Sequence, residues 1–168
     1  MRKQNFKIDN IPAILWGSKT KHLIVAVHGS MSRKDDTVIS MLAEEAVSKG
    51  YQVLSFDLPQ HGDRKNDTSY LCKTENCKKD LKTVMAYAHT LSDNISLFGC
   101  SMGAYFSLLA YKDEPLNQCL FLSPVVDMKR LIDSMMSYCS ISEEMLVNQK
   151  VIATIIGLPL YYDDYCFV

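Results

Sequence analysis

The sequence predicts an α/β fold built on a mostly parallel, doubly wound sheet. Apolar, β-branched runs alternate with segments of helical periodicity between residues 6 and 122. The run at 22–27 is short and continuous in apolar side chains after His22, which is typical of a strand covered by helices on both faces. Crossovers between parallel strands are right-handed in nearly every known case, so the alternation also predicts right-handed connections.

Local composition defines the individual elements in chain order. Segments with the composition of strands are 6–16, as an antiparallel pair around Pro12, and then 22–27, 51–56, 95–98 and 119–122. Segments expected to be helical are 36–49, 74–90, 102–111, 128–138 and 142–149. Asp35 or Asp36 is placed to cap the first helix, and Gly50 to end it. Residues 155–168 are apolar and aromatic without a clear period.

Two regions are expected along the chain. Residues 1–127 form a sheet-based core, and residues 128–168 form cap-like helices with an apolar tail. If the sheet stops after its sixth strand, at 119–122, that strand is an edge that exposes unpaired backbone groups beside apolar side chains. Either the segment 155–162 folds back over this edge, or a second copy of the chain pairs with it and makes a homodimer.

Composition excludes several classes of function. The chain has 168 residues and a net charge of −1, which gives no electrostatic reason to bind nucleic acid or an anionic membrane. The short basic clusters at 33–34 and 78–79 are expected at the solvated surface. No apolar run is long enough to span a membrane, and the basic start at 1–5 is not followed by the apolar run of a signal peptide.

The cysteines indicate a compartment rather than a metal site. Six cysteines include no Cys-x-x-Cys pair and no companion histidine at zinc-finger spacing, so no metal or cofactor is predicted. Cys100 and Cys119 lie in apolar strand segments, where a buried, reduced thiol is usual. Together these features predict a protein of the reducing cytoplasm.

The sequence Gly99-Cys100-Ser101-Met102-Gly103 joins the predicted strand 95–98 to a helix. A serine on a sharp strand-to-helix turn has an exposed hydroxyl, and flanking glycines let strand and helix pass closely. The backbone N–H of Met102, at the start of the helix, would point toward an oxyanion formed on an attacked carbonyl. Two alternatives stay open, an ordinary junction and the phosphate loop of a nucleotide-binding domain.

Three loops in order resemble the α/β-hydrolase superfamily. They are His28-Gly29 with Ser30 after one strand, the Asp57-Leu58-Pro59-Gln60-His61-Gly62 loop after the next, which looks like the family's Asp-x-Pro-Gly-His-Gly, and the turn around Ser101. Among members, the chain is most similar to small bacterial serine esterases that carry a cap after the sixth strand.

The resemblance implies roles for specific residues. Ser101 would be the nucleophile of an acyl-enzyme mechanism on an ester, thioester or amide, with esters the commonest case. The backbone N–H groups of Ser30 and Met102 would form the oxyanion hole, and His28 and His61 would line the site. The expected partner is a small-molecule ester, with no cofactor.

The chain departs from the family where the catalytic base is concerned. The family's order is serine, acid and then histidine, but all four histidines here (His22, His28, His61 and His89) precede Ser101. We therefore expect only the first two-thirds of the usual domain, truncated after about the sixth strand. His61 is a candidate substitute base, and Asp127 is either the triad acid or, as we favour, a helix N-cap.

Two hypotheses about function follow. The first is a carboxylesterase-like serine hydrolase that is inactive or incomplete as this chain. The second is a non-catalytic hydrolase-like remnant or interaction module.

Overall fold

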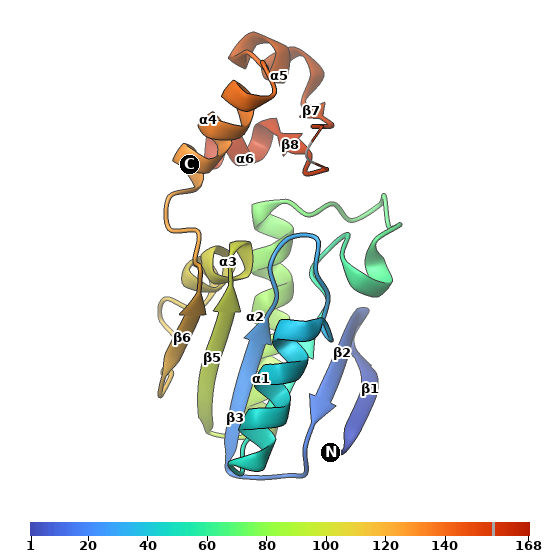
Figure 1. Ribbon diagram of the computed structural model, residues 1–168, viewed down its shortest axis with the longest axis vertical. Coiled ribbons are helices and arrows are strands. Elements are labelled where there is room, and N and C mark those ends of the chain that lie inside the picture. Colours follow the sequence, from blue (N-terminus) through green and yellow to red (C-terminus); the bar gives the residue numbers. More distant parts are fainter. Residues whose placement is uncertain (156) are drawn as a thin grey trace. The chain divides into compact units, whose positions relative to one another are not determined.

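A six-stranded sheet forms the centre of residues 1–124 in the computed structural model, which describes residues 1–155 and 157–168 (Figure 1). The strand order is β1-β2-β4-β3-β5-β6. The strands are β1 (Lys3–Ile8), β2 (Ile11–Trp16), β3 (His22–Val27), β4 (Gln52–Phe56), β5 (Asn94–Cys100) and β6 (Cys119–Leu122). β1 and β2 pair antiparallel, β2 joins β4 antiparallel, and the other pairings are parallel.

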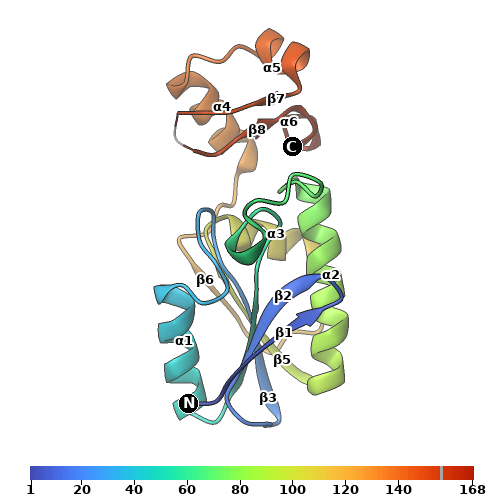
Figure 2. The same ribbon diagram turned by 90° about the vertical axis from the view of Figure 1, so that its right-hand side faces the viewer.

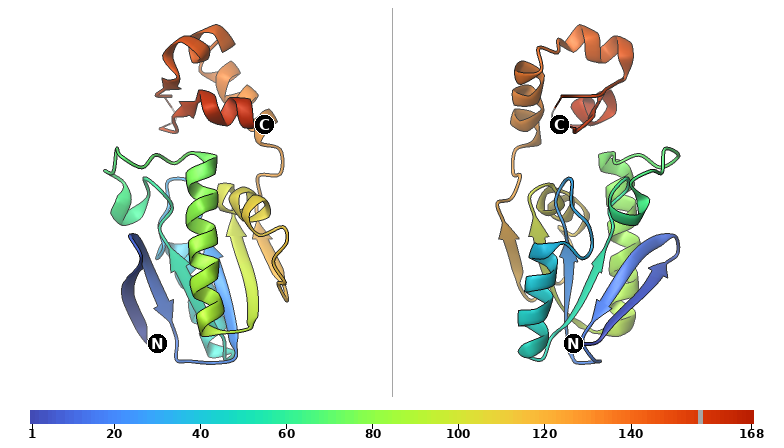
Figure 3. Two further views of the ribbon diagram at one scale, coloured as in Figure 1. Left: turned by 180° about the vertical axis from the view of Figure 1, so that it is seen from behind. Right: turned by 45° about the vertical axis from the view of Figure 1, so that its right-hand side comes forward.

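Helices cover both faces of this sheet. α1 (Thr37–Ser48) lies on one face, and α2 (Thr74–Leu91) and α3 (Met102–Ala110) lie on the other (Figures 2 and 3). A short 3-10 helix, η1 (Gly62–Arg64), lies in the loop after β4. From β3 the chain moves to β4 on one side of β3 in the sheet, and it then crosses over to β5 on the other side of β3. The direction in which strands are added therefore reverses beside β3. The carboxyl ends of β3, β4 and β5 meet at this reversal, which is where doubly wound sheets bind ligands.

The core beneath α1 combines apolar packing with one buried polar chain. Ile39 and Ala43 of α1 are fully buried against Ile14 and Val53 of the sheet. Within this layer the Trp16 indole donates to the Ser55 hydroxyl at 2.8 Å, and that hydroxyl donates to the carbonyl of Lys34 at 2.6 Å. The buried strand β4 is thereby fastened to the loop that precedes α1.

The structure confirms the predicted α/β sheet, with two differences at its edges. β1 begins at Lys3 rather than at residue 6, because the first residues of this edge strand are polar and exposed and carry no hydrophobic signal. Cys119 is exposed and Cys100 half-buried, where both were expected in the interior. Cys119 lies on β6, the strand at the edge of the sheet, so its side chain is exposed although it belongs to an apolar strand.

Residues 125–168 form a second compact unit. Its elements are α4 (Met128–Tyr138), α5 (Glu143–Gln149), β7 (Val151–Ile152), β8 (Leu160–Tyr161) and α6 (Tyr162–Phe167). Asp127 caps α4 by accepting from the N–H of Arg130 at 2.9 Å, the N-cap role favoured from the sequence. Leu160 and Tyr161 pair with β7, whereas Ile156 of the segment expected to cover the sheet edge lies outside the described residues.

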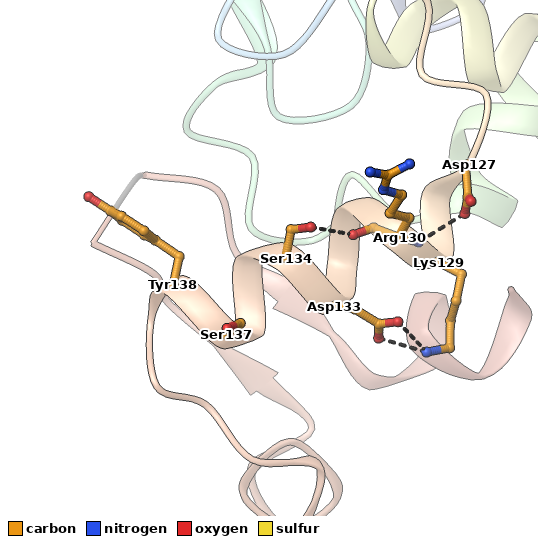
Figure 4. Close-up of a pocket in the computed structure, with 7 residues that line it drawn as sticks. All are labelled: Asp127, Lys129, Arg130, Asp133, Ser134, Ser137 and Tyr138. Atoms are coloured by element: carbon orange, nitrogen blue, oxygen red, sulfur yellow. Dashed lines mark hydrogen bonds and ion pairs between the residues drawn. The ribbon is translucent and has the colours of Figure 1, made fainter.

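The polar side of α4 borders a hollow of about 650 Å³ (Figure 4). Its lining includes the ion pair between Lys129 and Asp133, with Nζ and Oδ1 2.6 Å apart. The buried side of the helix carries Ile132 and Met135. In the described part of the chain, no helix is both long and apolar enough to cross a membrane.

We propose that the outer edge of β6 pairs with the same edge of a second copy. Leu120 and Leu122 are 60% and 45% exposed there, and residues 115–126 contain no charged side chain to discourage pairing. Leu120→Lys should raise the dimer dissociation constant about tenfold or more, because two lysines would meet across the edge. Sedimentation velocity over a concentration series measures this.

The matched control is Leu108→Lys, since Leu108 is 45% exposed and belongs to α3 rather than to β6. This substitution should leave the dissociation constant unchanged. A wild-type chain that stays monomeric at every concentration would contradict the proposed edge pairing.

Candidate active site

Ser101 stands at the turn between β5 and α3 in a strained backbone conformation. Its φ of 50° and ψ of −120° lie in a region that non-glycine residues rarely adopt, at a cost of about 1–3 kcal/mol. The Ser101 N–H donates to the carbonyl of Leu122 at 3.0 Å, and its own carbonyl accepts from Ala104 at 3.1 Å. These contacts hold the turn from both sides, and they orient the serine at the carboxyl end of the sheet.

The two glycines of the motif are required by close packing. A Cβ on Gly99 would lie 2.9 Å from Cα of Ala104, the backbone of the helix that follows. A Cβ on Gly103 would overlap the carbonyl oxygen of His28. The Gly-x-Ser-x-Gly pattern is therefore explained by the approach of α3 to β5 and to the loop after β3.

The backbone N–H groups of Ser30 and Met102 belong to the two segments that flank Ser101. The loop after β3 passes beside the serine, since a Cβ on Gly29 would lie 3.1 Å from Cβ of Ser101. The Ser30 hydroxyl reaches across to Met102 and donates to its Sδ at 3.1 Å. Neither the Ser30 N–H nor the Met102 N–H donates to another group in the described part of the chain.

Asp57 ties the loops after β3 and β4 together. Its carboxylate is fully buried and accepts from the Lys34 N–H at 2.8 Å, from Lys34 Nζ at 2.7 Å and from the Asp63 N–H at 2.9 Å. Lys34 Nζ also contacts the Asp63 carboxylate at 2.7 Å. A Cβ on Gly62, which has a φ of 51°, would collide with the Asp57 carboxylate. The spacing from Asp57 to Gly62 thus belongs to one folded loop.

Lys34 is the residue that the sequence analysis misplaced. It was expected at the solvated surface beside Arg33, but it is only 3% exposed. Burial alone would lower the pKa of Lys34, but its hydrogen bonds to Asp57 and Asp63 outweigh burial and raise the pKa. The sequence signal that could have found it is an acidic residue at the end of a buried strand, because such a carboxylate requires a cation.

Both ring nitrogens of His28 are occupied by backbone groups. Nε2 accepts from the N–H of Leu58 at 3.1 Å, so Nδ1 carries the proton and donates to the carbonyl of Gly29 at 2.7 Å. Burial, with a smaller effect of the neighbouring His61, lowers the pKa of His28 to about 4. His28 is therefore a neutral link between the loops after β3 and β4.

His61 is also engaged away from the serine. Its Nδ1 lies 2.8 Å from the carbonyl of Pro59, and its ring packs 5.3 Å from that of His28. Burial would lower the pKa of His61, but the hydrogen bond and charge of Cys72 raise it. Among the described residues, the Ser101 hydroxyl forms no hydrogen bond with any imidazole. The structure brings Ser101, Ser30 and Met102 together, and no described imidazole bonds to the serine hydroxyl.

Comparison with known proteins identifies the family to which this fold belongs. Residues 18–155 match the model of the family described as serine aminopeptidase S33 (Hydrolase_4). The chain belongs to this family, which has the α/β-hydrolase fold. No curated protein matches the sequence.

Solved structures share the fold at low sequence identity. Est1E from Butyrivibrio proteoclasticus, with ferulic acid bound, is 16% identical at a TM-score of 0.77 over 98% of this chain and 69% of its own. An esterase from Pyrococcus furiosus is 20% identical at 0.66 over 88% of this chain and 58% of its own. A cold-adapted esterase from an Arctic intertidal metagenomic library is 19% identical at 0.57 over 71% of this chain and 58% of its own. The chain thus corresponds to between 58% and 69% of each of these structures.

Lys34→Met should destabilise the protein by about 3–5 kcal/mol, because it leaves the buried Asp57 carboxylate without its cation. The control is Arg33→Met, whose ion pair with Asp35 is solvent-exposed and worth at most about 1 kcal/mol. Urea unfolding at neutral pH measures both changes. Equal losses for the two variants would show that Lys34 does not support the loop.

Protonation of His28 should destabilise the fold in acid. The folded side chain gains its proton only near pH 4, whereas the unfolded one gains it near pH 6.5. Its contribution is therefore complete above pH 6.5 and is lost as the pH falls toward 4, by about 2 kcal/mol between pH 7.5 and 5. Urea unfolding of wild type and His28→Gln measures this, and an equal pH dependence in the two would contradict it.

Proposed function

We propose that this chain carries the nucleophile and the oxyanion hole of a serine hydrolase that acts on small-molecule esters. The observation that supports this most directly is the left-handed Ser101 at the strand-to-helix turn, beside two open backbone N–H donors. A serine held at a cost in backbone energy is typical of a functional site. The comparisons support a hydrolase of this type through the family match.

In the proposed reaction, the Ser101 hydroxyl attacks the ester carbonyl. The carbonyl oxygen becomes an oxyanion that accepts from the N–H groups of Ser30 and Met102, and each such donor is worth about 3–4 kcal/mol in the transition state. The alcohol then leaves, and water releases the acid from the acyl-enzyme. This chemistry uses side chains and backbone alone.

The weak point of the site is the activation of the serine. A serine hydroxyl is a poor nucleophile at neutral pH without a base, and the ring nitrogens of His28 and His61 bond to other groups. Oxyanion stabilisation and binding alone still leave about 10³–10⁴-fold acceleration over water in triads that lack a member. We therefore propose slow turnover by this chain unless a base reaches Ser101 from a residue other than these.

The same observation favours a second candidate, a hydrolase-like protein that has lost catalysis and keeps the fold for binding. Ser101 would then hold its conformation only because α3 and β5 impose it. We also keep the reducing cytoplasm as the proposed location, since all six cysteines are thiols.

A fluorophosphonate probe separates the two candidates. The proposed hydrolase should be labelled at Ser101 and should turn over short acyl nitrophenyl esters slowly, and Ser101→Ala should lose both activities. Added imidazole should accelerate ester turnover by the wild type and leave Ser101→Ala unchanged, because it supplies the missing base. Mass spectrometry of the labelled peptide and absorbance of the released nitrophenol are the measurements.

The control is Ser48→Ala, since Ser48 lies at the end of α1 and donates to the carbonyl of Glu45. This variant should be labelled as well as the wild type. Absence of both labelling and imidazole-dependent turnover in a folded wild-type protein would reject the hydrolase and leave the non-catalytic candidate.

A further inference from the structure

Two cysteines face each other beside the loop that carries His61. Cys72 lies just before α2 and Cys77 lies in the first turns of that helix, with their Sγ atoms 3.7 Å apart. A disulfide has its sulfurs at about 2.05 Å, so the two atoms need to approach by less than 2 Å. Cys72 is half-buried and Cys77 is fully buried. An oxidant can therefore reach the first thiol, and the second is placed directly behind it.

His61 provides the second half of the arrangement. The Cys72 side chain lies near enough to raise the pKa of His61, and the His61 ring is held in place by the carbonyl of Pro59, 2.8 Å from Nδ1. An imidazole beside a thiol favours the thiolate, which is the form that reacts with oxidants. The neighbouring backbone is also fixed, because the N–H of Cys72 donates to the side chain of Gln60 at 2.8 Å. The nucleophilic sulfur is thus positioned by the loop that follows β4.

We propose that Cys72 and Cys77 form a peroxide-sensitive dithiol, with Cys72 as the sulfur that is oxidised first and His61 as its positioning base. A peroxide transfers one oxygen to the Cys72 sulfur, an S–O bond forms as the O–O bond breaks, and water leaves when the peroxide is hydrogen peroxide. The Cys77 thiol then attacks this sulfenic acid, an S–S bond forms as the S–O bond breaks, and a second water carries away the remaining proton and oxygen. The two thiols lose two electrons in total, and one peroxide is reduced to two waters.

Oxidation would act on the loops around the candidate site. Closing the disulfide draws Cys72 toward α2 and removes the thiol from His61. The ring of His61 packs against that of His28, which hydrogen bonds both to Leu58 and to Gly29 beside the oxyanion residue Ser30. The dithiol is therefore connected to the loops after β3 and β4, and it forms whether or not the protein hydrolyses esters.

Trypsin provides a direct test on the full chain. It cleaves after Lys65, Lys73 and Lys78, so Cys72 and Cys77 fall on separate peptides, 66–73 and 74–78. The reduced protein is treated with a small excess of hydrogen peroxide, alkylated and digested. Mass spectrometry should find these two peptides linked as the dominant oxidised product, and dithiothreitol should separate them.

Three variants complete the test. Cys72→Ser should abolish the linked pair and leave Cys77 alkylatable after unfolding, and His61→Gln should slow formation of the pair by about tenfold through loss of the imidazole. Cys119→Ser, which removes an exposed cysteine on β6, should change the rate by less than about twofold.

The proposal is overturned if other cysteines oxidise first while peptides 66–73 and 74–78 stay separate. It also fails if Cys119 enters mixed disulfides in the same yield as the pair. A normal rate in a folded His61→Gln variant would remove His61 from the mechanism and so contradict the proposed dyad.

Discussion

The buried carboxylate of Asp57 is the constraint on which the site depends. It cannot be desolvated at 0% exposure without compensation, and the compensation comes from Lys34 and from two backbone N–H groups on different loops. Ion pairing of this kind contributes little net stability, but loss of one partner is costly. Its effect is therefore geometric, because the loops after β3 and β4 can satisfy Asp57 only in one arrangement.

That arrangement also determines what the two histidines of these loops can do chemically. His28 is committed through both nitrogens to backbone groups of its own loop and of the loop after β4. His61 is held by Pro59 and Cys72. An imidazole whose nitrogens already bond to these groups cannot also accept a proton from Ser101, so the bonds that hold the loops after β3 and β4 leave neither of these two histidines available as a base.

The backbone strain at Ser101 and the close packing at Gly99 and Gly103 have the same cause. α3 approaches β5 so closely that side chains at Gly99 and Gly103 would strike backbone atoms, and this approach forces the intervening serine into a positive φ. The packing of the buried strands and helices around Ser101 offsets the energetic cost of this backbone conformation. The turn is maintained by packing, so its geometry persists independently of catalysis and identifies the fold more securely than it identifies activity.

The sequence predicts the α/β class, the approximate bounds of the sheet strands along the chain and the turn at Ser101, because these depend on local periodicity and on glycine at fixed spacing. It leaves the order of the strands in the sheet open. It missed the polar start of β1 and the exposure of Cys119, since edge position is a property of the whole sheet. The folded chain alone shows that Lys34 is buried, that His28 is a neutral link and that Cys72 lies beside Cys77 and near His61. Each of these features depends on contacts between loops that follow different strands, and such contacts produce no periodic pattern in the sequence.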